Sequence, residues 1–165
     1  MPRRARAFET RVRVAYADTD QMGTVYHANY LVWMERGRTE AMRELGLPYA
    51  ALEARGLRLP VIEAGLRFLR PARYDELLVI ATTFAALGRV RLRFHYEVRH
   101  ADRPEGPLLV DGFTEHAFVT PEGRVVRVPD DVRALVEPVV AGEAAVPARA
   151  ARPLARRGDG SQPRA

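Results

Sequence analysis

The chain has 165 residues, enough for one folded domain with a real core and too few for a second domain. Cysteine is absent, which excludes disulfides and thiolate metal sites. All 26 basic side chains counted as Lys+Arg are arginines, so a lysine Schiff base is excluded as well. The net charge of +5 comes from the two ends, because residues 8–140 carry one more acidic than basic side chain, so the domain is not expected to bind nucleic acid.

The two ends differ in composition from the middle of the chain. Residues 1–7 hold three arginines with no apolar segment after them, and no run elsewhere is long and apolar enough to cross a membrane. We therefore predict a cytoplasmic protein with a basic N-terminal extension (1–7) and one folded domain (8–140). Residues 141–165 are mostly Ala, Pro, Arg and Gly, which bury too little surface to offset their ordering entropy, so a disordered tail is predicted.

The first part of the domain predicts a strand followed by a long helix. Apolar and polar residues alternate over 8–17, the period of a strand with one wet face, and the strand is expected to end at Asp18-Thr19-Asp20. After a turn at Gly23, the proline-free segment 27–45 predicts a helix. Its apolar residues recur at three- and four-residue steps: Leu31, Met34, Ala41 and Leu45.

Small residues and breakers shape this helix and its end. Gly37 and Ala41 give it a surface that a sheet can approach closely, and Gly46 followed by Pro48 is a stop signal. A short second helix is predicted over 49–54, ended by Gly56.

The remainder reads as strands joined by short hairpins, over 58–70, 76–87, 89–101 and 108–119. A hairpin at 121–123 and a last helix from its cap Asp130 to Glu137 complete the domain. In the strand that starts at 89, apolar residues alternate with Arg89, Arg91, Arg93 and His95, which predicts one core face and one cationic face. The fold class is therefore α+β, with an antiparallel sheet wrapped over one helix, and its exposed edges favour pairing with a second copy.

The residue inventory restricts the chemistry. The only serine is Ser161, in the tail, so serine- and cysteine-based acyl enzymes are excluded, and no glycine-rich phosphate loop is present. Carboxylate, histidine and ordered water must do any catalytic work. Asp20 lies where a strand gives way to the turn that feeds a long helix, whose free N–H groups can polarise a carbonyl opposite that carboxylate.

Other interpretations of the same residues remain open at this point. Asp20 can be a helix N-cap, and His27 a hydrogen-bonded buried residue. A metal site from Asp18, Asp20 and His27 is a third possibility, though two carboxylates and one imidazole are a weak signal. Tyrosines 16, 26 and 30 fit core positions or a phenol hydrogen bond, and core positions are the more frequent case.

Residues 16–40 resemble the opening of small bacterial hotdog-fold acyl-CoA thioesterases of the hydroxybenzoyl-CoA thioesterase type, especially the branch associated with the Tol-Pal system. The stretch reads YADTDQMGTVYHANYLVWMERGRTE, with the core D-x-D-x-x-G-x-V-[YF]-[HYF]-x-x-Y. The likeness continues through 59–61, 70–77 and 88–94, and covers roughly residues 8–138. It implies a five- or six-stranded antiparallel sheet around one helix.

The resemblance also implies a mechanism and an assembly. Asp20 would be general base or nucleophile toward the thioester, with His27 and Tyr16 as auxiliary catalytic residues, and no metal or other cofactor is expected. The carbonyl would meet the helix start near Gly23, Val25 and Tyr26, at the interface of a homodimer that pairs into a homotetramer. Four arginines are candidate partners for the CoA phosphates, although a solvated face is an equal alternative for each: Arg70, Arg73, Arg89 and Arg91.

The function predicted is thus hydrolysis of acyl-CoA to free acid and CoA. A non-catalytic acyl-CoA-binding or regulatory hotdog protein, and a hotdog dehydratase or hydratase, are the alternatives. Many relatives carry a serine or threonine just after the glycine that corresponds to Gly88, where this chain has Arg89. That difference affects the predicted CoA contacts.

Overall fold

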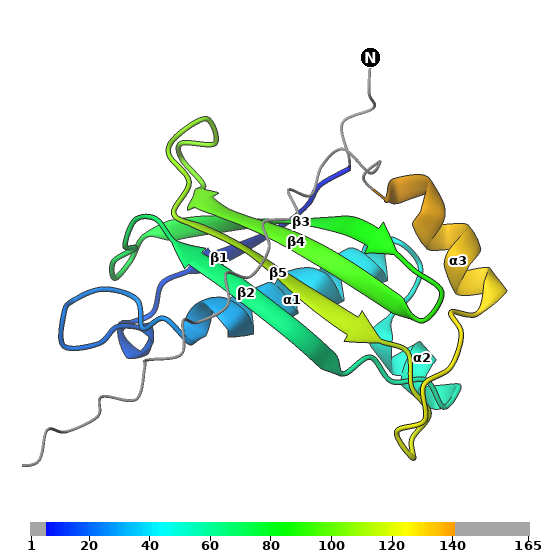
Figure 1. Ribbon diagram of the computed structural model, residues 1–165. Coiled ribbons are helices and arrows are strands. Elements are labelled where there is room, and N and C mark those ends of the chain that lie inside the picture. The colour runs from blue at the N-terminus through cyan, green and yellow to red at the C-terminus, as the bar shows by residue number, and fades with distance from the viewer. Residues whose placement is uncertain (1–5, 141–165) are drawn as a thin grey trace, which may run out of the picture.

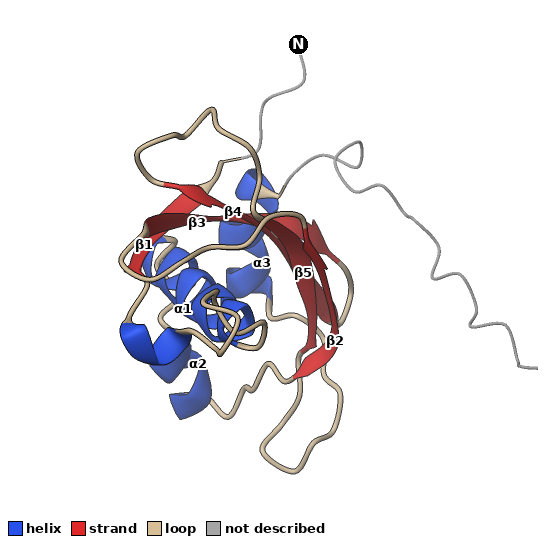
Figure 2. Cartoon of the chain, turned by 90° about the vertical axis from the view of Figure 1, so that its left-hand side faces the viewer, coloured by secondary structure: helices blue, strands red, loops and turns tan. Residues whose placement is uncertain are grey.

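The computed structural model describes residues 6–140, in which a five-stranded antiparallel sheet curls around one long helix (Figures 1 and 2). The strands are β1 Phe8–Arg13, β2 Val61–Phe68, β3 Leu77–Leu87, β4 Arg91–His100 and β5 Val110–Ala117. The helices are α1 Asn29–Glu44, α2 Tyr49–Ala54 and α3 Asp130–Val136, with 3₁₀ turns at Tyr16–Asp18 and Glu137–Val139. The predicted α+β class and the single central helix are confirmed.

The strands are ordered β1-β3-β4-β5-β2, and every neighbouring pair is antiparallel. Since β2 pairs with β5 and not with β3, the expected hairpin link between β2 and β3 is wrong. The chain instead crosses from one edge of the sheet into its middle, and β1 and β2 form the two edges. Within the described residues, no helix is long and apolar enough to cross a membrane.

Two predicted boundaries are corrected. The first strand ends at Arg13 rather than at 17, because the chain turns into a 3₁₀ helix in which the Asp18 carboxylate accepts a hydrogen bond from the Ala15 N–H at 2.8 Å. Helix α3 is preceded by Pro129, which occupies the cap position, so Asp130 is the first helical residue and not the cap. The predicted tail and most of the predicted N-terminal extension lie outside the described residues.

The predicted end of α1 is confirmed by its hydrogen bonds. Gly46 has a φ of +88°, and its N–H donates to the Arg43 carbonyl at 3.0 Å. The Leu47 N–H reaches back to the Met42 carbonyl at 2.8 Å. This double closure of the last turn needs a left-handed residue, which glycine adopts without strain.

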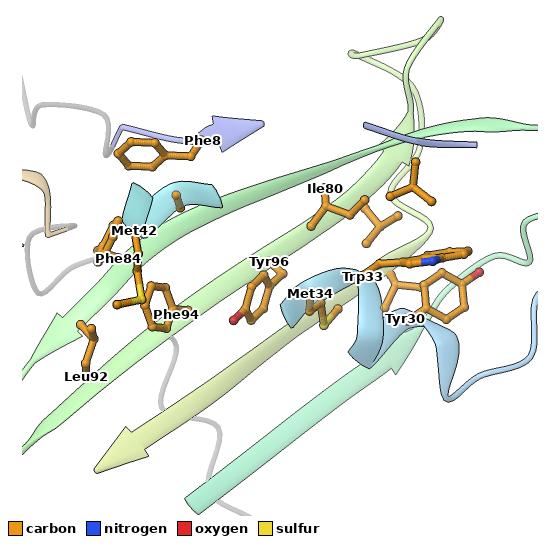
Figure 3. Packing of buried hydrophobic residues seen from close by; sticks show 14 of the residues in the cluster. Phe8, Tyr30, Trp33, Met34, Met42, Ile80, Phe84, Leu92, Phe94 and Tyr96 are labelled. Atoms are coloured by element: carbon orange, nitrogen blue, oxygen red, sulfur yellow. The ribbon is translucent and has the colours of Figure 1, made fainter. Parts of the chain in front are cut away.

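Helix α1 packs on the concave face of the sheet through a stripe that differs from the predicted one. Leu31 is 41% exposed, which corrects its assignment to the core. The buried residues of the helix are Tyr30, Trp33, Met34, Gly37, Ala41 and Met42, and several of them face side chains of β3 and β4 in Figure 3. The closest approach is at Gly37, where a Cβ atom would lie 2.7 Å from Thr82 Oγ1 and 3.1 Å from Ile80 Cγ2.

The outer face of the sheet is not the cationic face that the alternation in β4 predicted. Arg91 and Arg93 both pair with Glu115 on β5, and His95 Nε2 lies 2.7 Å from Asp111 Oδ1. Acidic residues of the neighbouring strand, invisible in the β4 pattern, therefore neutralise the row of cations. The apolar face was assigned correctly, since Leu92, Phe94 and Tyr96 are buried in the core.

A buried polar network lies beneath α1, centred on His116 of β5. The Arg38 guanidinium can only donate, so His116 Nε2, 3.0 Å away, accepts, and the Nδ1–H donates to the Leu59 carbonyl at 3.0 Å. Thr114 Oγ1 lies 2.9 Å from Nε2 and 2.7 Å from the Tyr96 hydroxyl. Burial, assisted by the charge of Arg38, lowers the pKa of His116 to about 4, so the imidazole is neutral.

Gly37→Ala is expected to lower the free energy of unfolding by about 1–3 kcal/mol, because the new methyl group meets Thr82 and Ile80 at overpacked distances. Chemical denaturation measures this change. Gly88→Ala is the matched control, since a Cβ there has its nearest neighbour, the Arg91 carbonyl oxygen, at 3.7 Å and should be tolerated. Equal stability of the two variants would contradict a tight helix–sheet contact at Gly37.

The stability of the protein is expected to fall as the pH drops from about 6.5 to about 4. The fold lowers the pKa of His116 from 6.5 to about 4, so as the pH falls the unfolded chain takes up this proton before the folded chain does. The resulting stabilisation of the fold is fully present above pH 6.5 and is lost as the pH falls through about 4. The total effect is about 3 kcal/mol. Denaturant unfolding at several pH values should show this slope in the wild type and a flatter one in His116→Gln.

Candidate active site

The loop that leads into α1 is held by backbone hydrogen bonds. The Asp18 carbonyl accepts from the Tyr26 N–H and from the Asn29 side-chain amide, both at 2.9 Å. The Val25 N–H donates to the Ala72 carbonyl at 2.9 Å, and an isolated β-bridge joins Thr19 to Val25. These contacts determine where α1 begins relative to the strand-end residues before the loop.

Asp20 lies at the base of a tight turn within this loop. Its carbonyl accepts from the Gly23 N–H at 2.9 Å, and its Oδ1 accepts from the Met22 N–H at 2.9 Å. Gly23 has a φ of +71°, which confirms the predicted turn there. The cap position of α1 is occupied by Ala28, without a side-chain cap hydrogen bond, so the alternative that Asp20 caps the helix is wrong.

A cleft of about 290 Å³ opens beside this turn, between the start of α1 and the end of β2. Asp20 and His27 lie on its wall with otherwise mostly apolar neighbours. Its lining consists of Asp20, Met22, Thr24, Val25, His27, Tyr30, Phe68, Leu69, Arg70 and Pro71. The arrangement is a small, largely apolar site with one carboxylate, one imidazole and one guanidinium.

His27 is exposed, which corrects the alternative of a buried, hydrogen-bonded histidine. Its ring centroid lies 4.4 Å from that of Tyr26 and 6.3 Å from that of Phe68, so the imidazole is held between two aromatic rings at the cleft. Tyr30, one helical turn further, is buried on the cleft floor, and burial raises the pKa of its hydroxyl. That hydroxyl therefore stays protonated near neutral pH.

Three backbone amides at the start of α1 are free. Within residues 6–140, the N–H groups of His27, Ala28 and Tyr30 have no backbone or side-chain acceptor. By contrast, the N–H groups of Gly23, Val25 and Tyr26 donate to carbonyls of the protein. The sequence placed Gly23, Val25 and Tyr26 near the thioester carbonyl, but their N–H groups are used to hold the loop. The free N–H donors belong to residues that follow them in the chain.

Exposure distinguishes the three tyrosines. Tyr16 is 80% exposed and packs edge-on against Tyr74, outside the cleft lining, and Tyr26 is 46% exposed. The core assignment is therefore wrong for these two tyrosines and right for Tyr30, which is 3% exposed. In the part of the chain that is described, no group of three or more His, Asp or Glu side chains, Asp18, Asp20 and His27 included, is placed to hold a metal ion.

The four candidate arginines separate into two pairs. Arg70 lines the cleft, and Arg73 Nη1 lies 4.0 Å from the Cβ position at Gly23. Phe68, at the cleft end of β2, is level with Val98 of β4, because both pair with Val110 of β5. Arg91 lies seven residues before Val98, so about 23 Å of β4 separate it from the level of the cleft. Arg89 lies beyond Arg91, so neither reaches the cleft of its own chain.

Sequence reasoning missed the residues that supply the apolar half of the cleft, Phe68, Leu69 and Pro71. Phe68 and Leu69 are 52% and 45% exposed, which is unusual for large apolar residues at the end of a strand. The sequence predicts a strand there and gives no sign of this exposure. The exposure follows from the position of β2 at the edge of the sheet in residues 6–140.

Comparison with known proteins places the chain in a family. The family model described as "Thioesterase superfamily" matches residues 22–106. A putative acyl-CoA thioesterase, YneP, from Bacillus subtilis is 38% identical over 111 residues, 67% of this chain and 78% of that protein. The acyl-CoA thioester hydrolase YbgC of Escherichia coli is 36% identical over 95 residues, 58% of this chain and 71% of that protein.

Among solved structures, a hypothetical protein from Thermus thermophilus is 40% identical, with a TM-score of 0.73 over 79% of this chain and 98% of that one. The family match, the identities and the shared architecture agree with one another and confirm the resemblance of residues 16–40. The chain belongs to the thioesterase superfamily, as a hotdog-fold thioester hydrolase.

Proposed function

We propose that this protein hydrolyses the thioester of acyl-CoA to a free carboxylic acid and CoA, with Asp20 as the catalytic carboxylate. The observation that carries the proposal is that Asp20 and His27 line one largely apolar cleft at the start of α1, where the N–H groups of His27 and Ala28 have no acceptor within residues 6–140. The chain has no cysteine and only one serine, so a carboxylate is the chemistry left for attack on a thioester. The names of its relatives from Bacillus and Escherichia support acyl-CoA as the substrate.

The proposed reaction begins with the thioester carbonyl oxygen at the start of α1. The N–H groups of His27 and Ala28, together with the positive end of the helix dipole, hold the negative charge that develops on that oxygen. Asp20 takes a proton from a water molecule whose oxygen attacks the carbonyl carbon, or attacks that carbon itself. In both routes the C–S bond breaks, and the CoA thiolate leaves and takes up a proton. Where Asp20 itself attacks, water then hydrolyses the mixed anhydride that has formed, which releases the free acid and restores the carboxylate.

His27 and Tyr16 have auxiliary roles in this proposal. The His27 imidazole, held between Tyr26 and Phe68, orients the thioester or the water beside Asp20. The Tyr16 carbonyl accepts hydrogen bonds from both the N–H and the hydroxyl of Thr19, which positions the strand end that carries Asp20. Tyr16 thus acts through its backbone, since its ring lies outside the cleft lining.

Arg70 and Arg73 are the proposed contacts for the CoA phosphates on the chain that carries the cleft. Guanidinium groups bind phosphates bidentately, and Arg70 lies on the lining of this largely apolar cleft. Arg89 and Arg91 enter only from a second copy. If β2 pairs antiparallel with β2 of that copy, the far end of one sheet lies beside the cleft of the other.

A homodimer is therefore part of the proposal, with pairing of dimers into a homotetramer as the resemblance implies. The edge strand β2 leaves one side of its backbone unpaired in the described chain, and large apolar side chains on and beside it are half exposed. The proposal places this assembly in the cytoplasm, where acyl-CoA is made and used.

Asp20→Asn is expected to reduce kcat about 100- to 10,000-fold, because the amide can neither accept the proton of water nor attack the carbonyl. The assay follows released thiol with a panel of short aliphatic, long-chain and aryl acyl-CoA. Asp18→Asn is the matched control, since the Asp18 carboxylate is engaged with the Ala15 N–H. A folded Asp20→Asn protein with wild-type kcat, or acyl-CoA binding by the wild type without turnover, would contradict the proposal.

Arg70→Ala is expected to raise KM for acyl-CoA about 10- to 100-fold with kcat nearly unchanged, because a charge-assisted contact to the CoA part of the substrate is lost in ground and transition states alike. Initial rates against acyl-CoA concentration separate the two constants. Arg36→Ala on the exposed surface of α1 should change neither. An unchanged KM in Arg70→Ala would remove this residue from the binding site.

A further inference from the structure

The loop between β2 and β3, residues 69–76, forms one wall of the candidate active site. Its first three residues line the cleft: Leu69, Arg70 and Pro71. Further along, the Ala72 carbonyl accepts the Val25 N–H at 2.9 Å, which ties the loop to the segment that leads into α1. The shape of this loop therefore decides where that wall lies relative to Asp20.

The far end of the loop is a strained turn. Asp75 has a φ of +66°, and within residues 6–140 it is the only residue other than glycine with a positive φ. A residue with a side chain is less stable in this backbone conformation, so the conformation persists only where neighbouring contacts hold it. The contacts around Asp75 therefore determine the shape of the loop.

Glu76 holds this turn with its side chain and with both of its backbone groups. Its Oε2 accepts the Arg73 N–H at 2.8 Å, and its own N–H donates to the Arg73 carbonyl at 3.3 Å. Its carbonyl accepts the Val14 N–H at 3.0 Å, beside the hydrogen bond from the Asp75 N–H to the Val14 carbonyl, also at 3.0 Å. One residue thus closes the turn and joins it to the chain that leads from β1 to Asp20.

The Glu76 carboxylate lies between this loop and the end of β4. Its side chain is 32% exposed, and Oε2 lies 3.9 Å from Nδ1 of His100. The cleft floor is near enough to feel its charge, because burial raises the pKa of the Tyr30 hydroxyl and the Glu76 charge raises it further. Glu76 is nevertheless not among the residues that line the cleft, so it acts on the loop rather than on a substrate.

We propose that Glu76 is a positioning residue for acyl-CoA hydrolysis, because its carboxylate fixes the Arg73 backbone and so places Arg70 and Arg73 for the CoA phosphates. This role rests on the proposed function and extends it to a side chain outside the cleft. Arg73 Nη1 lies 4.0 Å from the Cβ position at Gly23, so the direction of the Arg73 backbone decides whether the guanidinium stays beside the Asp20 turn. A hydrogen bond to an ionised carboxylate is a strong restraint on that direction.

This restraint affects substrate binding more than the chemical step. The Asp20 turn is closed by its own hydrogen bonds, from the Asp20 N–H to the Thr24 carbonyl and from the Gly23 N–H to the Asp20 carbonyl, both at 2.9 Å. Those bonds do not involve Glu76, so kcat should change little without it. The two arginines are carried by the loop itself, so without the restraint they bind CoA less well in ground and transition states alike, which raises KM.

Glu76→Ala is expected to raise KM for acyl-CoA about 10-fold with kcat within about threefold of the wild type, because both arginines lose their fixed positions. Glu76→Gln should restore most of the wild-type KM, since its amide oxygen can still accept the Arg73 N–H. The same acyl group on pantetheine, which has no phosphates, should give nearly the same KM in all three proteins.

Glu53→Ala on exposed α2 is the matched control for these measurements, and circular dichroism verifies the fold of each variant. A wild-type KM for acyl-CoA in folded Glu76→Ala would overturn the proposal. An equal rise in KM for acyl-CoA and acyl-pantetheine would also overturn it, because the effect would then not pass through the phosphate contacts.

A double-mutant cycle tests whether Glu76 acts through the two arginines. In the Arg70→Ala/Arg73→Ala background, Glu76→Ala should change KM less than about twofold, because residues that act through one another are not additive. A rise in that background as large as in the wild type contradicts the proposal. Amide hydrogen exchange of the 69–76 segment, followed by mass spectrometry, should be faster in Glu76→Ala and close to wild type in Glu76→Gln. Unchanged exchange in Glu76→Ala contradicts it as well.

Calorimetric titration with free CoA, which needs no turnover, keeps this proposal distinct from the proposed function. Glu76→Ala should weaken CoA binding by about the factor by which it raises KM. A wild type that hydrolyses no acyl-CoA but binds CoA in a Glu76-dependent way would overturn the proposed function and leave the positioning role standing. An active enzyme whose KM and CoA affinity ignore Glu76→Ala would do the reverse, and a wild type that neither binds CoA nor hydrolyses acyl-CoA would overturn both.

Discussion

The close approach of α1 to the sheet at Gly37 is the constraint on which the rest of the structure depends. With no side chain at that position, the helix lies against Thr82 and Ile80 of β3, and the larger residues around it fill the concave face (Figure 3). The position of the helix start follows from this contact, because an α-helix is a stiff rod. The cleft and the free amides both take their places from that rod.

The loop before α1 is held by backbone hydrogen bonds, which leave several of its polar groups free. The carbonyl of Asp18 and the amides of Val25 and Tyr26 are consumed in holding the loop. What remains is the second carboxylate oxygen of Asp20, the ring of His27 and the unpaired amides at the start of α1. No side chain caps the start of α1, so these donors remain available to a ligand. The missing cap normally makes that end of a helix less stable.

Arginine is the only basic side chain besides histidine in this chain, and the fold gives some of these arginines a carboxylate partner and leaves others without one. On the outer face of the sheet, Arg91 and Arg93 are matched by Glu115, so that face carries little net charge. Arg70 lies on the cleft lining and has no carboxylate within 4.0 Å in residues 6–140, so its guanidinium is available to a ligand there.

Local patterns were sufficient for most of the elements. The alternation in β4, the long proline-free helix, the glycine stop at Gly46 and the short helix α2 all appear as expected, because each depends on neighbours a few residues away. The family motif also identified Asp20 and His27, which the fold brings to one cleft. The sequence was wrong about Leu31 and Tyr16, where apolar character alone suggested burial.

Contacts between distant segments were decided only by the tertiary structure. The pairing of β2 with β5, the neutralised outer face and the cleft wall from Phe68 to Pro71 each join residues far apart in the chain. The meeting of Arg38 with His116, 78 positions later, has no counterpart in any local pattern. Periodicity tells which face of an element is buried, but the identity of the element that covers it depends on the closure of long loops and on packing, which no short stretch encodes.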